Sequence, residues 1–130
     1  MNEKELILKA IAVQKNSYSP YSEFPVGAAL LCTDGEVFTG VNVENVSFGL
    51  TNCAERTAFF KAISEGKRNF EAIAIVGKDT YLSPCGACRQ VMAEFCDENF
   101  RVIFAKNEND FVAKTLGEIL PFSFSEVDMK

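Results

Sequence analysis

The sequence predicts an α/β fold, a three-layer α/β/α sandwich with a mixed central sheet of about five strands. Two observations lead to this prediction. Apolar strands alternate with helices in the second half of the chain, which is typical of parallel strands covered on both faces. An Asp-Gly pair joins two apolar stretches in the first half and predicts an antiparallel hairpin. With 130 residues, the chain has the length of one domain, expected to span residues 1–130.

The first half of the chain predicts one helix and the hairpin. Residues 2–17 repeat apolar side chains at helical spacing. Two prolines within residues 17–25 then break the pattern, so this stretch predicts an ordered loop. Stretches 26–33 and 36–43 flank the Asp-Gly pair and predict two strands. The first of them is almost continuously apolar, which favours a central position in the sheet.

The second half predicts helices and strands in alternation, ending in a possible edge strand and a short helix. Gly66 is a typical residue to close the first of these helices, and Pro121 stops the last one. The predicted elements are helix 53–66, strand 70–77, helix 85–96, strand 101–106, a polar turn at 107–110 and helix 115–121.

The composition excludes several classes of partner. A formal charge of −5 and a pI near 4.8 argue against nucleic acid, because nucleic-acid-binding domains present a basic face. No apolar stretch approaches the ~20 residues of a membrane span, and the first residues lack the pattern of a signal peptide. We therefore expect a cytoplasmic protein that binds a small molecule. Twelve phenylalanines are more than a small core needs, so some are expected at a subunit interface.

The chain has five cysteines and no histidine. In the cytoplasm, cysteines are reduced thiols, metal ligands or core residues rather than a disulfide framework. Cys85 and Cys88 form a C-x-x-C pair at the expected start of helix 85–96. They lie on one face of a helical turn and could share one ion, and the helix N-terminus favours the thiolate form. The pair alone is compatible with a metal site, a redox disulfide or core packing.

Cys53 is the candidate for a third metal ligand, because it begins another predicted helix. Three protein ligands with an open fourth position are typical of catalytic zinc, whereas structural zinc is closed by four. A structural site would need Cys32 or Cys96. Cys32 ends an apolar strand and Cys96 ends a helix, so core packing is the better interpretation of both. A redox pair would leave Cys53 and its acidic neighbour unexplained.

That acidic neighbour, Glu55, could give a metal site its chemistry, because a carboxylate beside an activated water can take its proton and return it to a substrate nitrogen. Positions i and i+2 of a regular helix face different directions. Cys53 and Glu55 can therefore meet at one metal if Cys53 lies at the helix cap. Arg56 is the candidate to balance the charge of three thiolates. The simpler alternatives are that Glu55 is a first-turn glutamate favoured by the helix dipole and that Arg56 is a surface arginine.

Taken together, these stretches resemble the zinc-dependent cytidine deaminases, in particular their short homotetrameric form within the cytidine/deoxycytidylate deaminase superfamily. The resemblance extends over nearly the whole chain. "CAE" or "PCGAC" alone would indicate the wider superfamily, whereas "FPVGAAL" with "NVEN" indicates the enzymes that act on nucleosides. The matching stretches are "SPYSEFPVGAALL" (19–31), "TGVNVEN" (39–45), "NCAERTAFFKAI" (52–63), "LSPCGACRQVM" (82–92) and "ILPFSF" (119–124).

The resemblance implies hydrolytic deamination of cytidine and deoxycytidine to uridine and deoxyuridine with release of ammonia, in pyrimidine salvage. It implies one Zn²⁺ per subunit, held by Cys53, Cys85 and Cys88. Glu55 would be the proton shuttle, and Arg56 would hydrogen-bond the ligating thiolates.

The same resemblance implies a set of substrate contacts. Asn42 and Glu44 would hydrogen-bond the ribose hydroxyls, and as strand positions i and i+2 they would share a face. Phe24 would stack on the pyrimidine, and the backbone of Ala54 would help to hold the base. Phe124 would reach into the site of a neighbouring subunit of the homotetramer.

Two positions depart from the pattern of the family. Phe48 stands where many relatives have tyrosine, and Cys53 stands where the wider superfamily has histidine. The alternatives that stay open are an aminonucleoside deaminase of the blasticidin-S type, a non-catalytic zinc-binding module and a dithiol redox protein. Substrate comparison separates the first of these from a cytidine deaminase, and zinc content measured against free thiols separates the other two.

Overall fold

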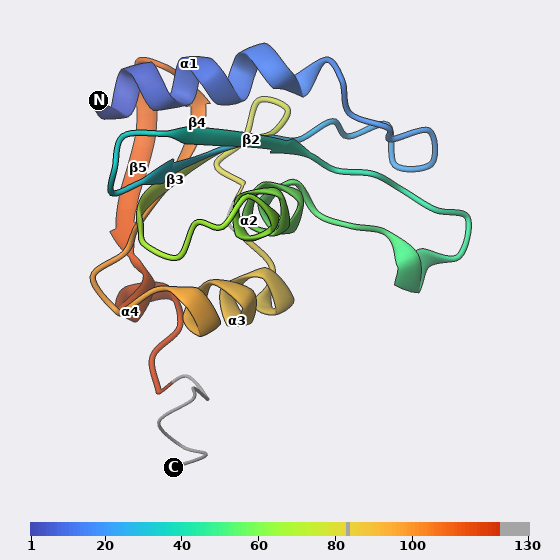
Figure 1. Cartoon of the computed structure of the whole chain (residues 1–130). Helices are drawn as coiled ribbons and strands as arrows, with labels where there is room; N and C mark the ends of the chain where they lie inside the picture. The colour runs from blue at the N-terminus through green and yellow to red at the C-terminus, as the bar shows by residue number, and fades with distance from the viewer. Residues whose placement is uncertain (83, 123–130) are drawn as a thin grey trace.

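The computed structural model describes residues 1–82 and 84–122, and Figure 1 shows a sheet with helices on both of its faces. Helix α1 covers one face, and α2, α3 and α4 lie on the other. The elements are α1 (Glu3–Gln14), β1 (Gly27–Cys32), β2 (Val37–Val41), the 3-10 helix η1 (Phe48–Leu50), α2 (Ala54–Ser64), β3 (Phe70–Val76), α3 (Gly86–Phe95), β4 (Arg101–Asn107), β5 (Asp110–Thr115) and α4 (Leu116–Ile119).

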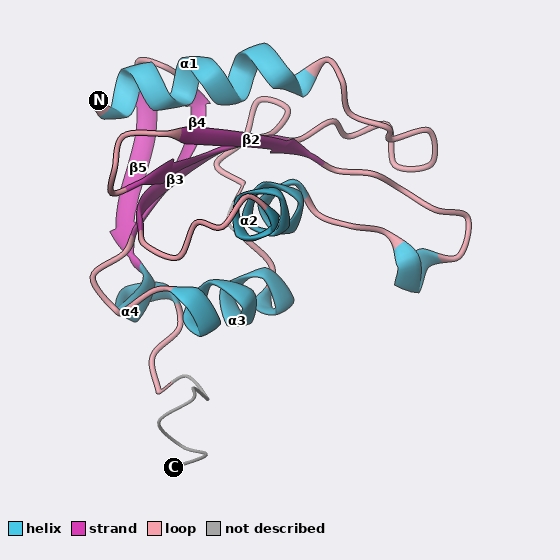
Figure 2. Cartoon of the chain, viewed as in Figure 1, coloured by secondary structure: helices cyan, strands magenta, loops and turns pink. Residues whose placement is uncertain are grey.

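The five strands form one mixed sheet in the order β2-β1-β3-β4-β5 (Figure 2). Strand β1 pairs antiparallel with both β2 and β3, and β4 pairs antiparallel with β5. Strands β3 and β4 are parallel, and α3 connects them as a crossover. The predicted α/β/α sandwich with a mixed sheet is confirmed, including the hairpin and the edge strand after the polar turn.

Strand β1 lies inside the sheet, between β2 and β3, and is buried on both faces, which explains its continuous apolar sequence. Ala28 and Leu30 belong to the core under α2 and α3, whereas Ala29 and Leu31 belong to the core under α1. This alternation follows from the two-residue period of a strand. The two cores of the sandwich are therefore separated by the sheet and share its strands.

The first helix ends earlier than predicted, at Gln14 instead of near Ser17. The N–H groups of Asn16 and Ser17 turn back to carbonyls three residues earlier, so the chain leaves helical geometry there. The Gln14 side chain donates to the carbonyl oxygens of Pro25 and Gly77, at 3.0 and 3.1 Å. The end of α1 is thereby tied to two loops that lie far from it in sequence.

The second strand is also shorter than predicted, since β2 ends at Val41 and the prediction extended to Val43. Beyond this point the chain leaves β1, and Val43 forms isolated bridges with Tyr18 and with Asn52. These partners are non-local, so the sequence pattern could not indicate them. The 3-10 helix η1 after this segment was not predicted either.

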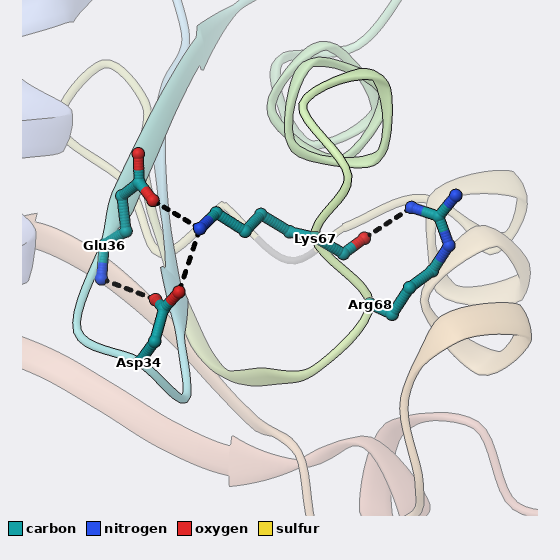
Figure 3. Close-up of polar contacts among 4 residues, drawn as sticks. All are labelled: Asp34, Glu36, Lys67 and Arg68. Atoms are coloured by element: carbon teal, nitrogen blue, oxygen red, sulfur yellow. Dashed lines mark hydrogen bonds and ion pairs between the residues drawn. The ribbon is translucent and has the colours of Figure 1, made fainter.

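The hairpin between β1 and β2 is held against the end of α2 by an ion cluster (Figure 3). Lys67 Nζ lies 2.9 Å from Asp34 Oδ2 and 2.6 Å from Glu36 Oε2. These two carboxylates raise the pKa of Lys67. Arg68 donates to the carbonyl oxygen of Lys67 at 2.7 Å. The hairpin turn and the turn that follows α2 each contain a glycine in the left-handed region, Gly35 at φ +93° and Gly66 at φ +89°. Other residues are strained in this conformation.

Gly40 lets the start of α2 approach strand β2 closely. A Cβ atom at this position would lie 2.4 Å from the carbonyl oxygen of Ala54 and 2.6 Å from the amide nitrogen of Ala58. Both contacts are with backbone, so they cannot be relieved by a side-chain rotation. The closeness of β2 and α2 therefore depends on the absence of a side chain at residue 40.

We expect Gly40→Ala to lower the free energy of unfolding by about 1–3 kcal/mol, because the added methyl group displaces the first turns of α2. Urea unfolding followed by circular dichroism measures this change. Lys4→Ala is the control, since Lys4 is exposed on α1, on the other face of the sheet from α2. It should leave the stability within about 0.5 kcal/mol of the unsubstituted protein. Equal stability of the two variants would contradict the packing argument.

Within residues 1–82 and 84–122, none of the helices has both the length and the apolar character needed to cross a membrane.

Candidate active site

Cys53 and Cys85 each occupy the N-cap of a helix. Cys53 precedes α2 with φ −76° and ψ 156°, and Cys85 precedes α3 with φ −67° and ψ 166°. Both backbones are therefore extended rather than helical. For Cys53 this is the cap position that the sequence required if Cys53 and Glu55 were to approach one metal. Cys88 lies one turn into α3 and is buried.

The tertiary structure brings the two helix starts together. The Sγ atoms of Cys53, Cys85 and Cys88 all lie within 4.8 Å of one another. The sulfur atoms of Cys85 and Cys88 lie 3.3 Å apart. The Cys85 sulfur also accepts the N–H of Cys88 at 3.4 Å. Three thiols from two helices thus form one cluster.

The groups around Cys53 favour its thiolate. The thiol of Cys88 donates to it, and Arg56 Nη2 donates to its sulfur at 3.3 Å. These donors lower the pKa of Cys53 to about 5. The pKa of Cys88 is raised, first because its proton is shared with Cys53 and then because it is buried. The Cys53 sulfur is therefore the one that most favours its thiolate form, and metal binding would release the protons that the cluster still holds.

The cluster fits a zinc ion. Sulfur atoms bound to one tetrahedral Zn²⁺ at ~2.3 Å lie about 3.8 Å apart, close to the spacing of these three. Thiolates are soft ligands that suit zinc. Cys53 and Cys85 also line a pocket of about 200 Å³, so a fourth ligand could reach the metal from that side. An open fourth position is the arrangement typical of catalytic rather than structural zinc.

Glu55 lies in the first turn of α2 and lines the same pocket, although only 5% of its surface is exposed. Burial, with a smaller contribution from the charge of Cys53, raises the pKa of Glu55 to about 7. A carboxyl group with such a pKa can both accept and release a proton near neutral pH. The position of Glu55 in the wall of the pocket that Cys53 and Cys85 also line therefore suits general acid–base chemistry.

The pocket is formed by segments that are distant in sequence. Three of its lining residues, Val26, Thr51 and Leu82, were not predicted as site residues. Val26 and Leu82 lie within stretches that carry the resemblance, and Thr51 directly precedes one, but nothing in the local pattern shows which way these side chains face. The described lining residues are Val26, Asn42, Thr51, Cys53, Ala54, Glu55, Leu82 and Cys85.

Asn42 lines the pocket and its amide group is fixed by the loop before β1. Its Oδ1 accepts from the amide nitrogen of Val26 at 2.9 Å and from the hydroxyl of Ser17. Its Nδ2 donates to the carbonyl oxygen of Phe24 at 2.9 Å. Asn42 is 9% exposed, so a substrate group would meet an amide whose orientation is already set.

Glu44 faces the same loop, but it is not among the pocket's lining residues. Its carboxylate accepts the N–H groups of Tyr21 and Ser22, at 2.9 and 3.1 Å, and the hydroxyl of Ser22. The Ser22 hydroxyl is the main cause of the lowered pKa of Glu44. Asn42 and Glu44 both lie beyond the end of β2, so the prediction that they are strand positions is wrong, but both contact residues 17–26.

Ala54, Phe24 and Phe48 lie in three different environments. Ala54 is fully buried at the start of α2 and lines the pocket. Phe24 is half-buried against the core, and its ring borders Gly77 opposite Leu82. Phe48 is 79% exposed. Phe124, predicted to reach a neighbouring subunit, lies outside the described residues.

Cys32 and Cys96 do not belong to the thiol cluster. Cys32 is buried in the core under α2 and α3, and Cys96 packs against the same core. Burial raises the pKa of Cys96 to about 12. The interpretation of these two cysteines as core residues agrees with their positions.

The sequence matches a family model described as "Cytidine and deoxycytidylate deaminase zinc-binding region" over residues 1–105. The chain is 48% identical to a cytidine deaminase of Sporosarcina psychrophila, with 99% of this chain and 96% of the relative covered. It is 52% identical to a cytidine deaminase of Halalkalibacterium halodurans, with 99% and 98% covered.

Solved structures agree with these matches. A cytidine deaminase of Burkholderia pseudomallei superimposes with a TM-score of 0.91 at 47% identity, covering 95% of this chain and all of that chain. A cytidine deaminase of Mycobacterium tuberculosis gives a TM-score of 0.85 at 38% identity, covering 95% and 98%. The matched zinc-binding region, together with the cluster of three cysteines, indicates zinc as the metal. The chain belongs to the cytidine and deoxycytidylate deaminase family.

Proposed function

We propose that this protein catalyses the hydrolytic deamination of cytidine and deoxycytidine to uridine and deoxyuridine with release of ammonia, as a step of pyrimidine salvage. The observation that carries the proposal is the placement of Glu55. Its buried carboxyl group lines a pocket whose wall also contains two of the three clustered cysteines. The names of the relatives supply the substrate class.

Cys53, Cys85 and Cys88 are the residues proposed to hold zinc, and Arg56 would balance part of their charge through its bond to Cys53. When bound, the metal would act as a Lewis acid that makes a water molecule acidic enough to attack at neutral pH. The three thiolates together outweigh the charge of Zn²⁺, so a positive group beside them favours the site.

Glu55 is proposed to move the protons of the reaction. Its carboxylate takes a proton from the attacking water and gives it to the ring nitrogen beside the amine-bearing carbon. The same carboxylate then takes the second proton of that water, from the hydroxyl group now on the carbon, and gives it to the amine nitrogen. The carbon–nitrogen bond breaks, a carbonyl group forms and ammonia leaves. A group with a pKa of about 7 suits both directions of transfer.

The proposed substrate contacts are those of the family, placed on the residues of this chain. Asn42 and Glu44 would bind the ribose hydroxyls, Phe24 would stack on the base, and the Ala54 backbone would hold it. The orientation of the Asn42 amide and its place in the pocket support its part of this proposal. Phe124 is proposed, from the resemblance alone, to contribute from a neighbouring subunit.

The decisive experiment follows the absorbance of cytidine after addition of purified protein, with zinc measured per chain in the same sample. We expect turnover and one zinc per chain. Parallel assays with deoxycytidine and blasticidin S test the substrate class, and preference for blasticidin S would replace the proposed substrate. Absence of turnover by zinc-loaded protein would refute the proposal.

We propose further that the protein is a homotetramer in the cytoplasm, where the clustered thiols stay reduced. The segment after β2 supports the oligomer, because it carries Val46, Phe48 and Leu50 with 79%, 79% and 70% of their surfaces exposed. This segment, green in Figure 1, projects away from the sheet and helices. Neighbouring exposed apolar side chains of this kind are typical of a protein–protein interface.

We therefore expect Phe48→Asp to lower the particle mass, since a carboxylate at the interface would lose its water on assembly. Size exclusion with light scattering measures the mass, which for the unsubstituted protein should be that of four 14.4 kDa chains. Leu8→Asp is the control, because Leu8 is exposed on α1, on the other face of the sheet. An unchanged particle mass in Phe48→Asp would contradict the proposal that this segment lies at a subunit interface.

A further inference from the structure

The two cysteines that cap helices are held in different ways. The sulfur of Cys85 accepts an N–H from its own helix, which fixes this side chain locally. Cys53 makes no such side-chain capping bond with α2. Its direction therefore depends on the bonds from Arg56 and Cys88 and on the groups that fix the backbone around it. A metal ligand whose side chain makes no capping hydrogen bond depends on neighbouring residues to hold it in place.

The peptide before Cys53 is fixed by the segment that follows β2. The amide nitrogen of Val43 donates to the carbonyl oxygen of Asn52 at 2.9 Å, and the amide nitrogen of Asn52 donates back to Val43 at the same distance. The two residues thus form an antiparallel bridge outside the main sheet. Asn52 cannot move away from Val43 without breaking both bonds.

The peptide after Cys53 is linked to Asn52 by the hydroxyl of Thr57. This hydroxyl donates to the carbonyl oxygen of Cys53 at 3.1 Å and accepts from Asn52 Nδ2 at 3.0 Å. A helical threonine often bonds to the carbonyl four residues earlier. Here the same oxygen atom also binds the residue on the other side of the cysteine. A hydroxyl group has one hydrogen and two lone pairs, so it can make both bonds at once.

We infer that Asn52 and Thr57 are positioning residues that hold Cys53 in its extended cap conformation and so prepare its sulfur for zinc. Neither residue lines the pocket. They act on the metal site through the peptide groups on both sides of Cys53. The inference rests on the proposed function, because it takes Cys53 to be a zinc ligand. Partners that orient metal ligands in this way change metal affinity by about 10- to 100-fold when they are removed.

The test compares Thr57→Val with Thr57→Ser. Valine keeps the shape of threonine but lacks the hydroxyl, whereas serine keeps the hydroxyl. The rate of zinc release from the loaded protein to a chromogenic chelator is the main measurement. We expect release to be about tenfold faster in Thr57→Val and close to the unsubstituted rate in Thr57→Ser. The urea midpoint of the zinc-free protein should be similar in both variants.

Asn52→Ala provides an independent variant, since it removes the other half of the bridge and leaves the helix sequence unchanged. It should also speed zinc release. The double variant should release zinc no faster than Thr57→Val alone, because valine already lacks the hydroxyl to which Asn52 donates. If the two substitutions had fully additive effects on the rate of zinc release, the inference that Asn52 and Thr57 act through one connection would be wrong.

Three other outcomes would overturn the inference. Thr57→Val could release zinc at the unsubstituted rate, Thr57→Ser could release it as fast as Thr57→Val, or a loss of stability in the zinc-free variants could account for the whole change. If the unsubstituted protein holds no zinc, the proposed function fails together with the inference. If it holds zinc and turns over cytidine, and the variants behave like it, the inference alone fails.

Discussion

Glu55→Gln is expected to lose most of its turnover while the protein keeps its zinc. Glutamine preserves the size of the buried side chain but cannot accept or release a proton, so both proposed proton transfers are lost. General acid–base catalysis contributes about 10²- to 10⁴-fold to a rate, and we expect kcat to fall by at least the lower figure. Because Glu55 performs more than one transfer in the proposed mechanism, a loss near the upper figure is the expected result.

Two measurements on Glu55→Gln keep this prediction specific. Zinc per chain should equal that of the unsubstituted protein, since the three cysteines are unchanged. The unfolding midpoint should not fall, because burial already disfavours the charged form of Glu55, as its raised pKa indicates. Rapid turnover by zinc-loaded Glu55→Gln would show that another group moves the protons.

Cys53→Ala is expected to lose both zinc and activity. The substitution leaves two thiols of the cluster, and it removes the one whose pKa is lowered to about 5 by its hydrogen-bond donors. Loss of a partner that merely orients a ligand costs up to about 100-fold in metal affinity, so loss of the ligand itself should cost at least that much. Zinc measured by competition with a chelator of known affinity tests this expectation.

Cys96→Ala is the matched control, because Cys96 is a half-buried cysteine that lies outside the cluster. It should keep one zinc per chain and normal turnover, with a loss of about 1 kcal/mol in stability from the shortened side chain. A Cys53→Ala protein that still held a full complement of zinc would show that the ligand assignment is wrong.

The order of elements could be predicted because its signals are local. The Asp-Gly turn, the helical spacing in residues 2–17 and the glycine that ends α2 each depend on residues a few positions apart. The errors occur where distant partners decide the structure. Strand β2 ends at Val41 because the chain turns there toward Tyr18 and Asn52. The hydrophobic periodicity of the sequence does not indicate that turn.

The residue types of the candidate site could also be predicted from the sequence. A C-x-x-C pair at a helix start, a third cysteine at another helix start and a glutamate two residues later suffice to suggest zinc with a proton carrier. The extended backbone at Cys53 then removes the difficulty that helix geometry raised for Cys53 and Glu55. The distance between the two helix starts, however, could not be obtained from their spacing of about thirty residues along the chain.

The sequence by itself therefore determined the fold class, the thiol ligands and the proton carrier to be expected, since residue type and short-range spacing encode these. Only the tertiary structure decided that the three sulfur atoms lie within 4.8 Å of one another and that Val26, Thr51 and Leu82 complete the pocket. It also showed that Gly40 leaves room for the start of α2 and that the Thr57 hydroxyl links the carbonyl of Cys53 to the side chain of Asn52. These features depend on contacts between segments that pack together after folding, and such contacts leave no regular pattern along the chain.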